Sequence, residues 1–289
     1  SNIMNTVDPK SQLVPPLWLM FLLVGFPQLS ETVYSPALPN IALSLGVGDH
    51  LVQWTLSIYF LGFAVGVFAW GRLSDSWGRR PSMLLGLVVY IIASMLCLFA
   101  NGIVGLLLAR LIQGLGASCG SVLTQTIARE ALPDQRRHKF FAAIGFVMAF
   151  AIALGPLLGG YLTSCFHWRA NFVLLCLIGL FLVVFVYFVL PETRPSNLHA
   201  QHKITKVLRL LVKDKQVLGS IWLVAAVNGI LFSYYAQGPF IFIRLMHFSA
   251  SGYGWLGAFI ALAALLGSLS ARYFLKRYLA VNLIATGCI

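Results

Sequence analysis

Two charged side chains stand inside long apolar runs of the sequence, where a membrane-spanning helix would bury them. Glu31 is the one acidic residue inside such a run, and Arg110 is the one basic residue well inside another. A charge at membrane depth costs several kcal/mol unless it is paired or neutralised, so such residues usually serve a function. We therefore expect Glu31 to carry a proton and Arg110 to act on it electrostatically. Two alternatives stay open: Glu31 could line or cap a helix end without titrating, and Arg110 could bond backbone carbonyls of the first helix.

A second set of charges occupies the turn between two apolar runs, over residues 71–81. Such a turn needs no carboxylate, yet Asp75 stands four residues before Arg79, a spacing that allows charge-assisted hydrogen bonds. We expect these bonds to form a latch that locks one conformation and breaks in another. Asp75 could instead cap the helix that follows the turn. The latch also includes Gly71, Gly78 and Arg80.

The composition places the whole chain in a membrane. It is 59% hydrophobic and only 10% charged, with a mean hydropathy of +0.86, whereas soluble domains carry roughly 25% charged residues. The apolar runs are continuous rather than alternating, and each is long enough for a helix of about 20 residues to cross the hydrocarbon core. The sequence therefore predicts an all-α polytopic membrane protein. Spans are expected at about 17–45, 51–73, 83–100, 103–128, 140–163, 170–190, 217–243 and 253–274, with a ninth starting near Leu279.

The basic residues give the orientation. The net charge is +12, but Lys and Arg are concentrated on alternate loops, and the opposite loops carry only Arg169 and Arg244. By the positive-inside rule the N-terminus and the long central loop are cytoplasmic. The basic run of that loop is expected to set topology and attract lipid headgroups, not to bind nucleic acid.

Three regions are expected along the chain. Residues 1–190 would form an N-terminal six-helix bundle, 191–216 a cytoplasmic linker, and 217–289 the first helices of a second bundle. A weak repeat supports this division, because residues 71–74 and 267–270 share a Gly-x-Leu-Ser pattern at the ends of the second and eighth spans. Two related six-helix halves would make a twelve-span protein, of which this chain holds the first half and part of the second.

Several of these segments resemble one transporter family. Residues 71–80 resemble the signature G-x-L-x-D-x-x-G-R-R/K, which lies between the second and third helices of the major facilitator superfamily (MFS). Residues 31–39 resemble the first helix of its Bcr/CflA drug-resistance branch, although Glu31 stands one position earlier than the family acid. Arg110 and Gln113 resemble the R-x-x-Q-G motif of the fourth helix. The resemblance implies the MFS fold and places the partner of the Asp75 latch on an eleventh helix.

A further resemblance concerns the direction of transport. Residues 155–160 resemble the motif associated with antiporters of the superfamily, and glycines with a proline there would form a hinge with closely packed backbones. The residues of this hinge are Gly155, Pro156, Gly159 and Gly160. The motif favours export over import.

The resemblance implies proton-coupled efflux of lipophilic small molecules or drugs across the bacterial inner membrane by alternating access. The expected partners are the solute, protons and the lipid bilayer, without nucleic acid, and the full-length protein is expected to be a monomer. A siderophore or metabolite exporter, a proton-coupled importer and a truncated fragment without transport activity remain alternatives. The sequence contains no G-x-x-x-x-G-K loop and no paired catalytic groups, so neither an enzyme nor a cofactor is expected.

Polar and aromatic groups at membrane depth are the candidates for solute contacts. They are Tyr34, Tyr59, Gln113, Gln125, Asn228, Tyr235 and Gln237. The five cysteines lie in different spans without metal-binding spacing, so neither a disulfide framework nor a metal site is expected.

Overall fold

The computed structural model describes residues 14–194 and 214–274, and eight helical stretches in these ranges are long and apolar enough to cross a membrane. They match the eight complete spans predicted from the sequence, while the predicted ninth span lies outside the described residues. The first span consists of α1 (Leu17–Tyr34), a 3₁₀ turn (Ser35–Ala37) and α2 (Leu38–Leu45). The others are α3 (Asp49–Trp77), α4 (Arg79–Leu98), α5 (Ile103–Ala131), α6 (Asp134–Cys165), α7 (Arg169–Val189), α9 (Lys215–Pro239) with a π-helical end (Phe240–Leu245), and α10 (Ala250–Phe274).

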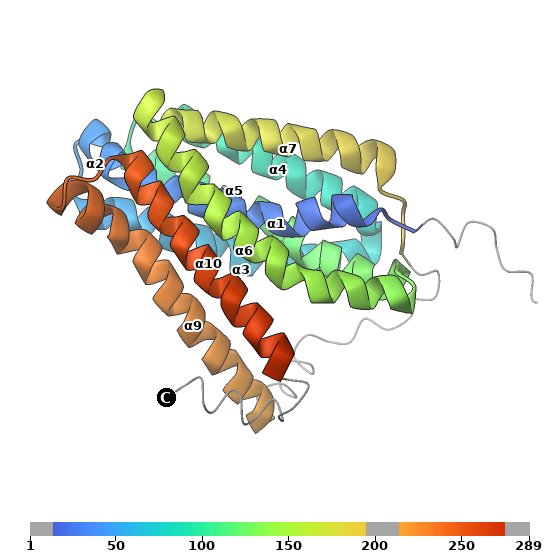
Figure 1. Ribbon diagram of the computed structural model, residues 1–289. Coiled ribbons are helices and arrows are strands. Elements are labelled where there is room, and N and C mark those ends of the chain that lie inside the picture. The colour runs from blue at the N-terminus through green and yellow to red at the C-terminus, as the bar shows by residue number, and fades with distance from the viewer. Residues whose placement is uncertain (1–13, 195–213, 275–289) are drawn as a thin grey trace, which may run out of the picture.

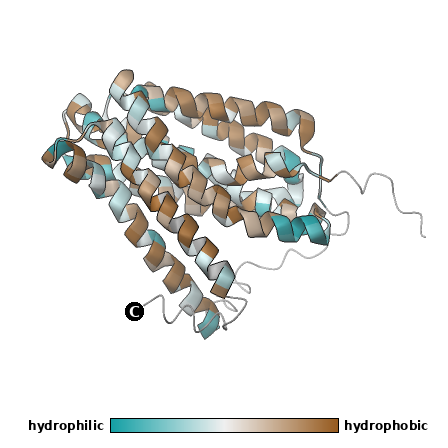
Figure 2. Cartoon of the chain, in the orientation of Figure 1, coloured by the Kyte–Doolittle hydropathy of each residue, from teal (hydrophilic) through white to brown (hydrophobic). Residues whose placement is uncertain are grey.

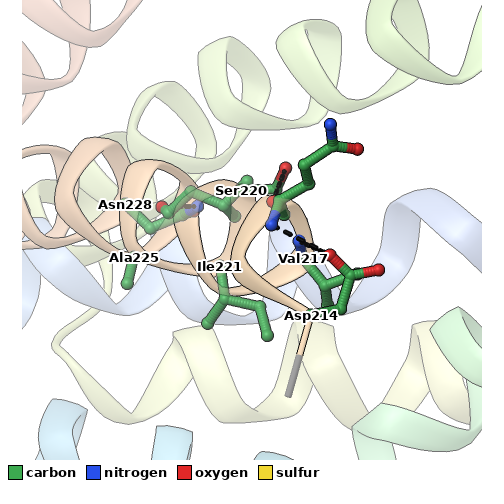
Figure 3. Close-up of a pocket in the computed structure, with 8 residues that line it drawn as sticks. Asp214, Val217, Ser220, Ile221, Ala225 and Asn228 are labelled. Carbon is green, nitrogen blue, oxygen red and sulfur yellow. Dashed lines mark hydrogen bonds between the residues drawn. The ribbon is translucent and has the colours of Figure 1, made fainter. Parts of the chain in front are cut away.

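The helix limits follow from local sequence chemistry. Gly46 adopts a left-handed conformation, with φ of 62°, and ends α2. Pro133 precedes the first turn of α6, where its missing N–H costs nothing. Asp214 caps α9 because its carboxylate accepts hydrogen bonds from the backbone N–H groups of Gln216 and Val217 (Figure 3). The cap starts α9 at Lys215, so two residues of the predicted linker are helical. Residues 195–213 of that linker lie outside the described residues.

The first six spans form one bundle around α1 (Figure 1). Most of α1 is buried, and it packs mainly against α6 and α5. The hydropathy colours show apolar helix bodies with polar residues gathered near helix ends, as at the start of α6 (Figure 2). This pattern suits helices whose bodies lie in lipid and whose ends meet water. We call the end of the bundle that carries the α3–α4 turn the Arg79 end, and the opposite one the Asp49 end.

Helices α9 and α10 meet the bundle near the Asp49 end and diverge from it towards their other ends (Figure 1). At the Asp49 end the Ser35 hydroxyl donates to the Tyr235 carbonyl at 2.6 Å, and Arg244 pairs with Asp49 at 2.5 Å. Away from that end most of α9 is exposed. The described helices are therefore closed against each other at the Asp49 end and separated towards the Arg79 end.

Candidate functional site

Glu31 lines a cavity between the first bundle and α9. Its side chain is on α1, 6% of the residue's surface is exposed, and it forms part of the wall of a hollow of about 460 Å³. A proline inside α1, Pro27, lies in the same wall. Most of the remaining lining is apolar or aromatic, so the carboxyl group faces a largely hydrophobic space. The other lining residues are Val24, Gln28, Phe60, Phe63, Ser121, Met148, Asn228, Gly229 and Phe232.

Both parts of the chain build this cavity. Phe60 of α3 and Phe232 of α9 meet with their ring centroids 4.2 Å apart. Asn228 of α9 also lines a second hollow of about 730 Å³, which extends along α9 to Asp214 (Figure 3). The space beside Glu31 is thus followed by a further hollow along α9 towards the start of that helix.

A neighbouring amide holds the Glu31 carboxyl group. Gln28 Nε2 lies 2.5 Å from Glu31 Oε1, one turn earlier on the same helix. Sequence reasoning missed Gln28, although its i, i+3 spacing from Glu31 was a signal that could have found it.

Arg110 is fully buried and is held by uncharged groups. Its guanidinium lies 4.3 Å from the ring centroids of both Tyr34 and Tyr59, and Nη1 donates to Gln113 Oε1 at 2.5 Å. A long bond of 3.5 Å runs from Nε to the carbonyl of Thr55 on α3, so the backbone contact comes from the second span and not from the first. Nη2 has no hydrogen-bond partner among the described residues.

Arg110 and Glu31 interact through space. They form no ion pair within 4.0 Å, but they lie within electrostatic reach of each other. Two aromatic faces attract the cation by cation–π interaction, which grows stronger when the cation is desolvated. The arrangement keeps a permanent positive charge near Glu31 without occupying its carboxylate.

The predicted solute contacts divide into three groups. Asn228 lines the cavity with Glu31. Tyr34, Tyr59 and Gln113 surround Arg110 instead, where Gln113 also donates to Ser94. Gln125 bonds Ser121 at 3.4 Å, Tyr235 is buried at the Asp49 end, and Gln237 is exposed. The aromatic pair of Phe60 and Phe232 was missed, because apolar spans contain many phenylalanines and only the fold selects these two.

Arg79 is the centre of a charged cluster at the end named after it. The residue is 2% exposed, and its guanidinium bonds Asp75 and Glu130, each at 2.7 Å, and the Ser74 hydroxyl at 2.6 Å. The Asp75–Arg79 spacing therefore does produce the charge-assisted bond that the sequence suggests. Glu130 of α5 also belongs to this cluster, because it accepts two hydrogen bonds from Arg79.

Glu192, and not Asp75, caps α4. Its two carboxylate oxygens accept from the backbone N–H groups of Arg79 and Arg80 at 2.9 and 3.1 Å. Gly78 makes this contact possible, since its φ is 110° and a Cβ there would lie 2.6 Å from the carboxylate. Arg80 donates to the Tyr187 carbonyl at the end of α7. A Cβ on Gly71 would meet no neighbouring side chain or helix within 4 Å, so no described contact requires a glycine there.

The glycines of α6 lie between α1 and α10. A Cβ on Gly155 would stand 1.9 Å from Thr32 Oγ1, and one on Gly159 would stand 1.9 Å from the Val33 carbonyl. On the other side of α6, a Cβ on Gly160 would stand 2.3 Å from the Ala250 carbonyl oxygen. A Cβ on Gly254 of α10 would stand 2.5 Å from the Pro156 carbonyl oxygen. Residues 155–160 therefore join α1 to the second part of the chain by close backbone contact.

The chain is similar to bacterial proteins whose names refer to transport or to drug resistance. The chain is 36% identical over 263 residues to an uncharacterized transporter of Rickettsia felis, covering 91% of this chain and 65% of that protein. It is 29% identical to a bicyclomycin resistance protein homolog of Haemophilus influenzae, over 81% of this chain and 60% of the relative. With the multidrug resistance protein MdtL of Escherichia coli it shares 27%, over 84% and 62%. The chain thus spans about 65% or less of the length of these relatives.

Solved structures agree on the fold. A bacterial homolog of the human lysosomal transporter Spinster, inward-facing and unoccupied, matches with a TM-score of 0.73 at 18% identity, over 94% of this chain and 64% of that one. A D-xylose-proton symporter matches with a TM-score of 0.67 at 16% identity, over 91% and 69%. A family profile described as Major Facilitator Superfamily matches residues 20–289. This chain is a member of the Major Facilitator Superfamily.

Proposed function

We propose that the protein exports lipophilic small molecules across the bacterial inner membrane in exchange for protons, by alternating access. The observation that carries the proposal is the position of Glu31, a carboxyl group in the wall of a largely apolar cavity built by both parts of the chain. The similarity to a bicyclomycin resistance homolog and to MdtL supports a drug-like solute.

The exchange follows from the two protonation states of the Glu31 carboxyl group. Protonated Glu31 is neutral and compatible with the apolar cavity, whereas ionised Glu31 needs a partner to offset its desolvation. A solute that offers a positive charge or hydrogen-bond donors supplies that partner, so its binding favours release of the proton. Arg110 supports the exchange because its nearby fixed charge stabilises the ionised form without forming a direct ion pair.

The conformation supports access from the Arg79 end. By the distribution of basic residues this end is cytoplasmic. In our proposal the cavity loads from the cytoplasm in this state, while the contacts of Ser35 with Tyr235 and of Asp49 with Arg244 keep the outer end closed. Opening outward requires these contacts to break, and the close backbone packing at Gly155 and Gly160 provides the surfaces against which α1 and α10 move.

The Arg79 cluster suits a latch in the conformation whose cytoplasmic end is closed. Asp75 is 47% exposed in its side chain, so one carboxylate of the cluster remains accessible to another helix. In our proposal this carboxylate engages the second half of the transporter when the cytoplasmic end closes.

Transport by the whole protein in proteoliposomes tests the proposal. With an imposed proton gradient we expect uphill movement of ethidium or chloramphenicol, one a cation and the other neutral. Glu31→Gln should lower the uphill rate at least 100-fold, because it removes the proton carrier itself. Asp134→Asn is the matched control, because this carboxylate is exposed and pairs only with Arg137 among the described residues. Unimpaired proton-driven transport by Glu31→Gln would overturn the assignment of the proton site.

A further inference from the structure

Gln28 stands out in the cavity wall because it is the polar group in direct contact with Glu31. The two side chains meet at 2.5 Å, and both line the cavity, so the contact lies where a solute would bind. Gln28 is only half-buried, and its amide can therefore reach the solute space as well as the carboxylate.

The backbone around Gln28 is fixed by a second contact. The hydroxyl of Thr32 donates to the Gln28 carbonyl at 2.8 Å, one turn along α1. Thr32 packs closely against α6, since its hydroxyl lies 3.5 Å from the Ala151 carbonyl and Gly155 leaves no room for a Cβ beside it. The turn from Gln28 to Thr32 is thus braced against α6, which keeps the amide opposite Glu31.

The other described groups around Glu31 make no hydrogen bond to its carboxyl group. Arg110 of α5 acts from beyond ion-pair distance, and Tyr59 of α3 and Tyr235 of α9 lie within electrostatic reach without a hydrogen bond to it. Tyr90 of α4 bonds Ser30 instead. The α6 residue in the cavity wall has no titratable group. Among the described residues, the amide is the one hydrogen-bond partner of the carboxyl group.

We propose that Gln28 is a positioning residue for the proton site: its amide holds the Glu31 carboxylate in the cavity wall and sets the pH at which Glu31 gives up its proton. This inference rests on the proposed function of Glu31. An N–H donor bonds an ionised carboxylate about twice as strongly as a neutral partner, so the amide favours the ionised form. A solute that donates hydrogen bonds to the carboxylate adds to this stabilisation of the ionised form, and the added stabilisation is lost when the solute leaves. The proton goes to water in the first step and comes back from water in the second.

Infrared difference spectroscopy of the whole transporter in lipid nanodiscs tests the inference without any solute. The carbonyl band of protonated Glu31 is identified as the band that disappears in Glu31→Gln, and its amplitude is followed against pH. Gln28→Met keeps the length of the side chain but removes the donor, so the midpoint should rise by about 1 pH unit. Gln125→Met is the matched control, because Gln125 does not itself line the cavity and its amide bonds Ser121 and not Glu31. The midpoint of Glu31 in this variant should equal that of the wild type.

The outcomes separate the two proposals. An unchanged midpoint in Gln28→Met, with the Glu31 band present, would overturn the role of Gln28 and leave the proton site standing. The absence of any carboxyl band that Glu31→Gln removes, over the whole pH range, would overturn both. A rise in Gln28→Met equal to a rise in Gln125→Met would also reject the inference, because the shift would then be unspecific.

Discussion

Arg79 and Arg110 are both buried, but the protein surrounds them with opposite chemistry. Arg79 bonds two carboxylates and a hydroxyl at the end of the bundle. Arg110 lies between two aromatic rings and an amide, and its Nη2 has no partner among the described residues. A satisfied ion cluster holds three helix ends together, whereas an arginine held by neutral groups keeps its charge available to another group. The contacts of Arg79 indicate a structural role in this conformation, and in our proposal Arg110 serves the proton site at Glu31.

Among the variants compared below, the largest effect is expected for Arg110→Met, which removes the arginine assigned to the proton site. Met fills the space between the rings of Tyr34 and Tyr59 but removes the charge near Glu31. We expect the rate of uphill transport to fall at least 100-fold, measured in proteoliposomes. Thermal unfolding in detergent should change little, because Arg110 has no ion-pair partner within 4.0 Å that would be left uncompensated and Met avoids the cost of burying a charge. A large loss of stability would show that Arg110 is structural after all.

Arg79→Met should instead act mainly on the stability of the protein. Its removal leaves Asp75 and Glu130 facing each other without a cation, and we expect a loss of about 2 kcal/mol in the free energy of unfolding, less than for a fully buried pair because both carboxylates are partly exposed. Adding Asp75→Asn and Glu130→Gln to this variant should recover most of the loss. Urea unfolding followed by tryptophan fluorescence would measure both changes, and a failure of the triple variant to recover would contradict the ion-cluster account.

The ring contacts of Arg110 can be tested at Tyr59. Tyr59→Phe keeps the aromatic face and should leave transport near the wild-type rate. Tyr59→Leu removes that face, and we expect it to weaken the site by about 1–2 kcal/mol, the strength of a desolvated cation–π contact. The ratio of the two transport rates is the measurement. Equal rates would mean that the ring only fills space.

The last comparison separates Gly78, between α3 and α4, from Gly71, which lies inside α3. Gly78→Ala should destabilise the protein by about 1–3 kcal/mol, because alanine is strained at a φ of 110° and its Cβ would meet Glu192. Gly71→Ala should stabilise it by up to ~1 kcal/mol, since alanine favours the helix and nothing lies near the added Cβ. Differential scanning fluorimetry would rank the two variants. Equal melting temperatures would remove the distinction between a required and an unrequired glycine.

The sequence predicted the eight complete spans because a long apolar run in lipid must satisfy its own backbone hydrogen bonds, as a helix does. It also predicted the pairing of Asp75 with Arg79, which the structure confirms. The proton-site roles of Glu31 and Arg110 stay predictions, drawn from the fact that isolated charges are conspicuous in apolar sequence. It did not predict that Glu192 caps α4, because residues more than a hundred positions apart meet there. It likewise missed the pair of Phe60 and Phe232, since side chains on separate helices become neighbours only through packing.

The exchange of proton for solute at Glu31 is the central claim, and proton release on solute binding tests it most directly. The whole transporter in detergent would be mixed with ethidium and, separately, with chloramphenicol, in weakly buffered solution containing a pH indicator. We predict that at least one of them releases protons from the wild type and from Asp134→Asn, and that Glu31→Gln binds the same solute without release. Equal release from Glu31→Gln and the wild type would contradict the account.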